Sequence, residues 1–436
     1  MAYPTSIIFD RKPGVIPPAE QIQLYSQLKH EYGAKGIDKI IRRAEKAVFD
    51  AVRALKKLPA GTKEPNALSA IQKARPAGPR RLWKSIDPAV FRERLEGALL
   101  GRMAGCTLGA PVEFWDVVKM ERMAKEYKVA FPPVNYWPDA HDRLRVRYNV
   151  SKIEEYTLKK MNGVPVDDDI VYTLIGLLIL EDYGPRFTTA DVGRAWLRYL
   201  PMACTAEDIA LKNLKKGVPA DKAGEVDNPY CEWIGADIRS DPWGYVAPGW
   251  PEKAAELAYR DAYLSHRREG VYGEMYFSAV IAAAFAVNDP VEALKIGLSE
   301  IPAKSAMADG VKWALKISPR IRNFKQAREI VEKEFTGMSW VHTIINACLT
   351  ILGITIGKKD FTKVISQTVA MGMDNDCTAA TAGSIVGAVV GKKGIPARWY
   401  KPFHNKVKSY FYGNPVFKID DLIKRFMKQA DSVFKA

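Results

Sequence analysis

Apolar residues at helical spacing, from residue 88 almost to the C-terminus, restrict the fold of this chain more than any other feature. Segments with that spacing follow one another, whereas alternating apolar and polar segments, which are typical of strands, are scarce. We therefore predict an all-α fold, a compact multi-helix domain with helices over residues 88–108, 113–127, 170–182, 189–200, 205–214, 251–268, 273–287, 289–299, 304–316, 325–334, 339–353, 360–370, 377–390 and 419–434.

The first 86 residues have a different character. Four prolines predict an extended arm over residues 1–18. Helical spacing resumes over residues 19–58, with a break near 33–36, and a segment rich in Pro, Gly, Ala and Lys follows at 59–79. We interpret residues 1–86 as a basic N-terminal arm and helical extension that ends in a linker.

A helix start at Asp87-Pro88 marks the beginning of the main domain, because Asp is a good N-cap and Pro suits the first helical turn. We therefore place the main domain at residues 87–436. Two regions, 130–166 and 217–250, are rich in Pro, Gly, Trp, Tyr and Asp and predict long loops inside it. Loops of that length in a compact helical domain usually carry function.

The net charge of +15 is concentrated at the two ends of the 436-residue chain. Residues 1–86 carry +10 and residues 392–436 carry +8, so the middle is slightly acidic at −3. A basic surface formed by the ends would attract a polyanion. The alternative is solvated helix faces that maintain solubility, which we favour, so we do not expect a nucleic-acid partner.

Cysteine usage and hydropathy indicate a cytoplasmic protein. The five cysteines are odd in number and do not form a disulfide framework, which favours a reducing compartment. The N-terminus lacks the basic and then apolar pattern of a signal peptide. The longest apolar stretch, residues 170–180, is too short to cross a bilayer, so we expect no membrane association.

Three adjacent acids, Asp167, Asp168 and Asp169, precede one apolar helix. They repel one another, and the partial positive charge of a helix N-terminus offsets part of that repulsion. Capping needs only one acid, whereas a divalent cation would neutralise several. The pattern therefore predicts either a metal site or a solvated acidic cap.

A second acidic segment, Asp374-Asn375-Asp376-Cys377, also precedes a helix. Carboxylates with no histidine nearby suit Mg²⁺ or Mn²⁺ better than zinc. An Asx turn is the alternative interpretation. The helix that follows is rich in Gly and Ala, which permits close approach of a neighbouring backbone.

A third segment runs from Gly97 to Glu113 and reads GALLGRMAGCTLGAPVE. Its small residues again allow close helix packing, and Pro111 presents Glu113 on a turn. On its own, Glu113 is more often a surface acid than a functional one.

Together, the three segments resemble the ADP-ribosylglycohydrolase family, which includes the dinitrogenase reductase-activating glycohydrolase. The family's opening motif, GALLG-x-x-x-G-x-x-LGAPVE, aligns with residues 97–113, its Thr-Asp-Asp-Thr motif with 167–170, and its late Asp-Thr-Asp-Thr motif with 374–377. The resemblance covers roughly residues 88–400. It implies an all-α catalytic domain over residues 87–436 that binds two Mg²⁺ or Mn²⁺ ions.

The resemblance also implies the metal ligands, which are Asp167, Asp168, Asp169, Asp374, Asp376 and Cys377. Asp167 and Cys377 stand where the family has threonine, and Ile170 lacks a hydroxyl that the family has there. Because sulfur is a poor Mg²⁺ ligand, coordination at Cys377 is either lost or favours Mn²⁺. Glu113 is implied to reach the metals or the substrate.

A middle loop resembles the family's Asn-Gly-x-Ala-Met-Arg substrate loop. The residues implied to bind substrate are Gly235, Asp237, Arg239, Trp243 and His266. Asp237 stands where the family has methionine. The alternatives are that His266 is an interior histidine and that the aromatic residues of the loop pack in the core.

We therefore hypothesise a hydrolase that cleaves the glycosidic bond at C1 of a ribose in ADP-ribosylated protein or in a small ADP-ribose conjugate. Glu113 is assigned the proton transfer, and Asp168 is assigned as a second catalytic residue that also bridges the metals. The identity of the leaving group and the oligomeric state stay open.

Three other functions are also considered. A non-catalytic binder of ADP-ribose or a nucleotide would follow from the departures at Cys377 and Asp237. A nucleoside hydrolase would use the same scaffold. A Mg²⁺-dependent prenyl-diphosphate enzyme would use the triple aspartate, although that motif needs a further acid where Val171 and Tyr172 stand.

Overall fold

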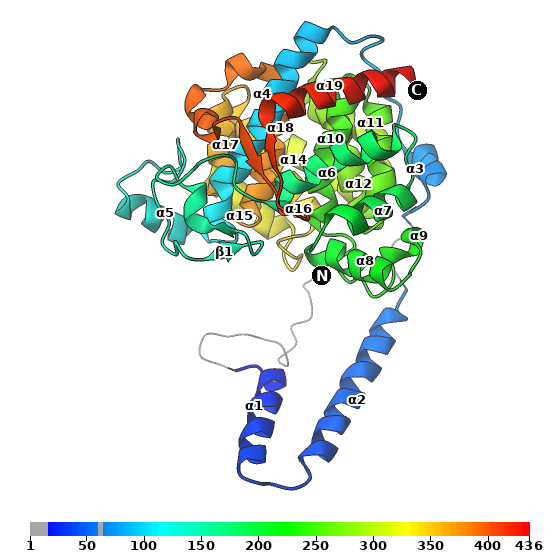
Figure 1. Ribbon diagram of the computed structural model, residues 1–436, viewed down its shortest axis with the longest axis vertical. Coiled ribbons are helices and arrows are strands. Elements are labelled where there is room, and N and C mark those ends of the chain that lie inside the picture. Colours follow the sequence, from blue (N-terminus) through cyan, green and yellow to red (C-terminus); the bar gives the residue numbers. More distant parts are fainter. Residues whose placement is uncertain (1–15, 60–63) are drawn as a thin grey trace. The chain divides into compact units, whose positions relative to one another are not determined.

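The computed structural model describes residues 16–59 and 64–436, so most of the predicted extended arm lies outside the described residues. The chain divides into two compact units, residues 1–63 and residues 64–436, each of which is described by itself (Figure 1). Among the described residues, every helix falls short of the length and apolar character that a bilayer span requires.

The smaller unit contains the helices α1 (Pro18–Glu31) and α2 (Ile37–Lys56). Gly36 precedes α2 with a φ of 85°, a conformation that glycine adopts without a steric penalty. The predicted break in helical spacing near residues 33–36 is thus the turn between these two helices. Neither helix buries a residue.

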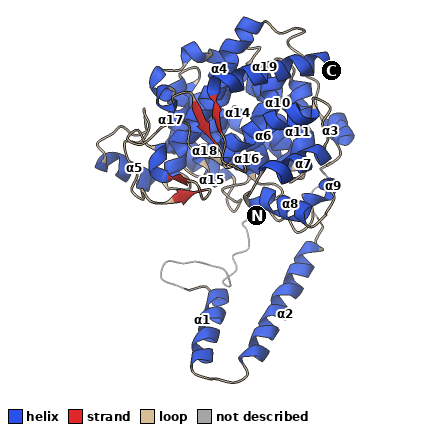
Figure 2. Ribbon diagram, viewed as in Figure 1, coloured by secondary structure: helices blue, strands red, loops and turns tan. Residues whose placement is uncertain are grey.

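The larger unit is mainly helical and has only two short strand pairs among the described residues, which confirms the predicted all-α class (Figure 2). Each of the predicted main-domain helices is present: α4 (Pro88–Gly109), α5 (Val117–Glu126), α6 (Asp168–Tyr183), α7 (Thr189–Tyr199), α8 (Thr205–Lys215), α11 (Pro251–Ala262), α12 (Glu269–Ala284), α13 (Pro290–Gly297), α14 (Ala306–Ile317), α15 (Phe324–Glu334), α16 (Thr343–Gly357), α17 (Phe361–Ala370), α18 (Asn375–Val390) and α19 (Ile419–Lys435).

The long segments between these helices contain some short elements. The first segment carries an antiparallel strand pair, β1 (Val146–Arg147) and β2 (Ser151–Lys152), and the second carries α9 (Ala220–Ala223) and α10 (Ser240–Val246). A second antiparallel pair, β3 (Lys406–Lys408) and β4 (Val416–Lys418), precedes α19.

Helices α4 and α18 pack against each other along their small residues. A Cβ atom built on Gly97, Gly101 or Gly105 would lie 2.2, 2.2 and 2.0 Å from the carbonyl oxygens of Gly387, Gly383 and Ala379, respectively. The two backbones therefore touch directly, and the order of these pairs shows that the helices run in opposite directions. This packing places the C-terminal end of α4, and with it Glu113, beside the start of α18.

Residues 64–86 pack on the larger unit. Their helix α3 (Leu68–Ala74) buries Ile71 completely. Arg75 and Arg80 both form ion pairs with the buried carboxylate of Glu300, at 2.6 and 2.8 Å. The backbone N–H of Trp83 donates to the carbonyl oxygen of Gly249 at 3.0 Å. This segment is therefore part of the larger unit.

Candidate active site

The two acidic segments meet at one place in the larger unit. One nitrogen of Arg147, Nη2, lies 3.0 Å from Oδ2 of Asp167 and 3.0 Å from Oδ2 of Asp376. The two aspartates come from the N-terminal ends of α6 and α18, and both are almost fully buried. The predicted convergence of the distant acids is thus present.

The triple aspartate forms the first turn of α6. Asp167 is the N-cap, and its Oδ1 accepts the backbone N–H of Asp169 at 3.2 Å. Asp168 accepts the hydroxyl of Tyr148 at Oδ1, at 2.7 Å. Asp169 is paired with Arg102 at Oδ1, at 3.2 Å, and accepts the Cys377 thiol at Oδ2, at 3.0 Å.

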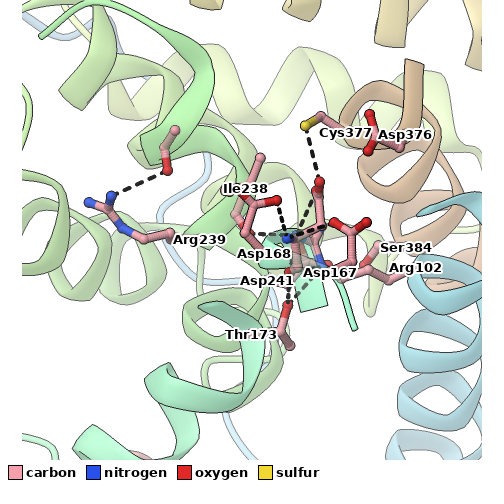
Figure 3. Close-up of polar contacts among 12 residues, drawn as sticks. Arg102, Asp167, Asp168, Thr173, Ile238, Arg239, Asp241, Asp376, Cys377 and Ser384 are labelled. Atoms are coloured by element: carbon pink, nitrogen blue, oxygen red, sulfur yellow. Dashed lines mark hydrogen bonds and ion pairs between the residues drawn. The ribbon is translucent and has the colours of Figure 1, made fainter. Parts of the chain in front are cut away.

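The buried side chain of Arg102 holds the first turn of α6 in place. Its buried guanidinium donates to Thr173 Oγ1 at 2.7 Å and pairs with Asp241 Oδ2 at 2.6 Å, in addition to Asp169 (Figure 3). It also donates to the carbonyl oxygen of Ile238. One arginine of α4 therefore ties α6 to α10 and to the segment before it.

The late acidic segment contains oxygen atoms with no hydrogen-bond partner among the described residues. These atoms are Oδ1 of Asp374, of Asn375 and of Asp376, and all three side chains are buried. Gly372 and Met373 adopt φ values of 70° and 61°, which turn the chain sharply into α18. Ligand atoms of Asp374, Asp376 and Cys377 lie within 4.8 Å of one another.

Glu113 lies at the edge of this cluster. Its Oε2 is 2.9 Å from Nη1 of Arg147, and its side chain is 25% exposed, so solvent reaches the acids from this side. Burial, followed by the charge of Asp376, raises the pKa of Glu113 to about 8. Burial also raises the pKa of Asp169 to about 8 and that of Asp374 well above its usual range.

The residues of the predicted substrate loop lie in the core. Arg239 forms ion pairs with Glu207, Asp261 and Glu274 at 2.7, 2.6 and 3.4 Å. Its guanidinium points away from Asp167 and Asp168 (Figure 3). The indole N–H of Trp243 donates to Glu274 at 2.8 Å.

The other three predicted substrate-binding residues are equally enclosed. Asp237 accepts the hydroxyl of Thr343 at 2.9 Å, while its Oδ1 has no partner among the described residues. A Cβ atom on Gly235 would lie 2.2 Å from Glu207 Oε1. Burial lowers the pKa of His266 well below its usual range, so this histidine is neutral. A role of these five residues in substrate binding stays a prediction.

Comparison with known proteins agrees with this geometry. The sequence model of one protein family, described as ADP-ribosylglycohydrolase, matches residues 87–433. The chain belongs to the ADP-ribosylglycohydrolase family. A solved structure, titled "ADP-ribosylglycohydrolase-related protein complex", shares the fold with a TM-score of 0.51 and 19% sequence identity over 80% of this chain and 99% of that chain. No curated protein matches.

The acidic cluster fits a hard cation. A buried carboxylate oxygen without a hydrogen bond is costly unless a cation binds it, and Asp374 and Asp376 each present one. Oxygen donors of this kind suit Mg²⁺ or Mn²⁺. Sequence reasoning had singled out these acids, and their role as metal ligands stays a prediction.

Sequence reasoning missed Arg147, Tyr148 and Arg102, the residues that hold these acids. Arg147 and Tyr148 lie in region 130–166, whose length and composition predicted function without pointing to single residues. Arg102 lies within the family motif itself, as one of its variable positions. A basic residue in the middle of a Gly- and Ala-rich helix was the one signal for it, because a buried charge needs a partner.

Proposed function

We propose that this chain hydrolyses the glycosidic bond at C1 of a ribose in ADP-ribosylated protein or in a small ADP-ribose conjugate, with Mg²⁺ or Mn²⁺ held by the acidic cluster. The observation that carries the proposal is the meeting of the acids that begin α6 and α18, with unpartnered oxygens on Asp374 and Asp376. Family membership supports the class of reaction.

Glu113 is proposed as the proton donor to the leaving group. With a pKa of about 8 it keeps its proton at neutral pH, and its place at the solvent-reached edge suits contact with a substrate. Arg147 holds Oε2 in place, so the other carboxyl oxygen carries the proton. Protonation matters most for an arginine leaving group, which departs as neutral guanidine.

Asp168 is proposed to orient the attacking water. The Tyr148 hydroxyl and the Asp169 backbone N–H both donate to Oδ1 of Asp168, which fixes the carboxylate. A divalent cation, when bound, orients the ribose hydroxyls and promotes the ionisation of water. The oxocarbenium-like transition state of glycoside hydrolysis is stabilised by the surrounding carboxylates.

The test is release of ADP-ribose from a panel of ADP-ribosyl-arginine, ADP-ribosyl-serine and O-acetyl-ADP-ribose substrates, with Mn²⁺ and with EDTA. We expect turnover with Mn²⁺, loss with EDTA, and at least a 100-fold loss, on the order of 3 kcal/mol, in Asp374→Asn/Asp376→Asn. Asp309→Asn is the matched control, because that aspartate is 70% exposed on α14. Unchanged turnover in the double variant would refute the proposal.

A second candidate is a binder of ADP-ribose that does not cleave it. The observation that favours it is the 2.9 Å contact of Glu113 with Arg147, because a guanidinium favours the ionised carboxylate, which has no proton to donate. Tight binding of ADP-ribose without product over a long incubation would support it. Family membership gives no support to the prenyl-diphosphate alternative.

A further inference from the structure

We infer that Arg147 supplies one of the positive charges in the acidic cluster, so that the site holds one divalent cation beside a guanidinium rather than two cations. This inference rests on the proposed function for its metal. The observation that carries it is the position of the guanidinium, which contacts carboxylates from three separate segments.

These contacts place the guanidinium between the three carboxylates. Nη1 of Arg147 lies 2.9 Å from Glu113, and Nη2 lies 3.0 Å from both Asp167 and Asp376. A guanidinium stays charged at all ordinary pH values, and its planar donors match carboxylates. A divalent ion between the same three carboxylates would have to displace Arg147.

The surroundings of Arg147 hold it in that position. Its side chain is 7% exposed, and Nη1 also donates to the carbonyl oxygen of Ala110 at 2.6 Å. The rings of Tyr148 and Tyr156 lie 5.3 and 5.4 Å from its guanidinium carbon, within the range of cation–π attraction. Its backbone is paired with Ser151 in the β1–β2 ladder. These contacts therefore fix the Arg147 side chain inside the acidic cluster.

The oxygens that remain fit a single ion. Both oxygens of Asp167 already accept hydrogen bonds, Oδ1 from the Asp169 backbone N–H and Oδ2 from Arg147. Buried carboxylate oxygens without a partner belong to Asp374 and Asp376 in this cluster, and one oxygen of each residue lies within 4.8 Å of the Cys377 sulfur. A second group, Cys106, Asp167 and Asp169, is equally close together, but every carboxylate oxygen in it is already paired with a protein donor. Since Mg²⁺ and Mn²⁺ usually keep several waters, these donors suffice for one ion.

The experiment counts Mn²⁺ ions on the full chain by equilibrium dialysis with elemental analysis, and records the electron paramagnetic resonance spectrum at low temperature. We expect one ion per chain with the spectrum of an isolated ion. Arg147→Met, which removes the charge and keeps the length, is expected to bind a second ion and to give an exchange-coupled spectrum. Arg143→Met is the control, because Arg143 is 55% exposed in the same loop.

Two coupled ions in the wild-type chain would overturn the inference, and so would a single ion in Arg147→Met. If Arg147→Met does not fold, the wild-type count still decides, and Arg147→Lys is expected to keep one ion. Absence of any bound ion would contradict the proposed metal-dependent function as well. One bound ion without ADP-ribose release would contradict the proposed function alone.

Discussion

The thiol of Cys377 lies 3.0 Å from Oδ2 of Asp169, so the first turn of α18 contacts the first turn of α6 through a sulfur atom. In Cys377→Ser we expect Mg²⁺ to bind about tenfold more tightly, a gain of about 1.4 kcal/mol, because a hydroxyl is a harder ligand. Mn²⁺ affinity is expected to change less. Isothermal titration calorimetry measures both.

Cys348→Ser is the control for this substitution, since Cys348 is also buried but donates to Gly310 in another part of the core. Equal changes in Mg²⁺ and Mn²⁺ affinity in Cys377→Ser, or a loss of Mg²⁺ affinity, would show that residue 377 does not select the ion.

Removal of the buried arginine beneath the site should destabilise the fold. Arg102→Met leaves Asp169 and Asp241 buried without their partner, and we expect the free energy of unfolding to fall by about 3–5 kcal/mol. Urea unfolding measures this. Arg92→Met is the control, with an expected loss below about 1 kcal/mol, because Arg92 is 48% exposed. Equal losses would mean that Arg102 does not hold the acids.

The contact between α4 and α18 should not tolerate a methyl group. A Cβ atom in Gly105→Ala would lie 2.0 Å from the Ala379 carbonyl oxygen, so the helices must separate. We expect a loss of about 2–3 kcal/mol in the free energy of unfolding. In Gly193→Ala the nearest atom is at 3.3 Å, and the change should stay within about 1 kcal/mol. A stable Gly105→Ala variant would contradict the direct backbone contact.

Two truncations should distinguish the smaller unit from residues 64–86, which pack on the larger unit. Deletion of residues 1–63 should leave the melting temperature unchanged, because the chain divides there. Deletion of residues 1–86 also removes Arg75 and Arg80 from the buried Glu300, which should cost about 3–5 kcal/mol. Differential scanning calorimetry measures both. An equal loss in the two truncations would contradict the division at residue 63.

A carboxyl pair away from the active site should make stability depend on pH. Glu64 and Glu269 accept the backbone N–H groups of Ala306 and Met307, at the start of α14, at 3.0 and 2.7 Å. Burial, followed by a hydrogen bond to Glu64, raises the pKa of Glu269 to about 9 from the usual 4.5. Between these pH values the folded chain keeps a proton that the unfolded chain releases.

The stabilising effect of that proton is complete below about pH 4.5 and is lost as the pH rises through about 9. The free energy of unfolding should therefore fall by up to about 1.4 kcal/mol per pH unit in that window. Glu269→Gln, which mimics the protonated form, should remove this part of the slope. Chemical unfolding at pH 6, 7.5 and 9 measures the difference, and parallel slopes would refute the assignment.

Much of this fold follows from local sequence. Helical spacing predicted the fourteen helices of the main domain, and Asp87-Pro88 predicted the start of α4, because caps and apolar periodicity act within a few residues. The acids at 167–169 and 374–376 were also recognisable as a pair of helix starts. The short helix α3 was missed, since seven residues within a Pro- and Gly-rich segment carry little periodicity.

Long-range packing decided the rest. Arg147 enters the acidic cluster because the close contact of α4 and α18 brings Glu113 and Asp376 within reach of the β1–β2 turn. Arg239 lies among three carboxylates instead of beside Asp168, because a buried charge is stable only where partners from other helices enclose it. The local sequence predicts which side chains lie at the start of a helix. Only the packing of distant segments determines which oppositely charged side chain lies next to each of them.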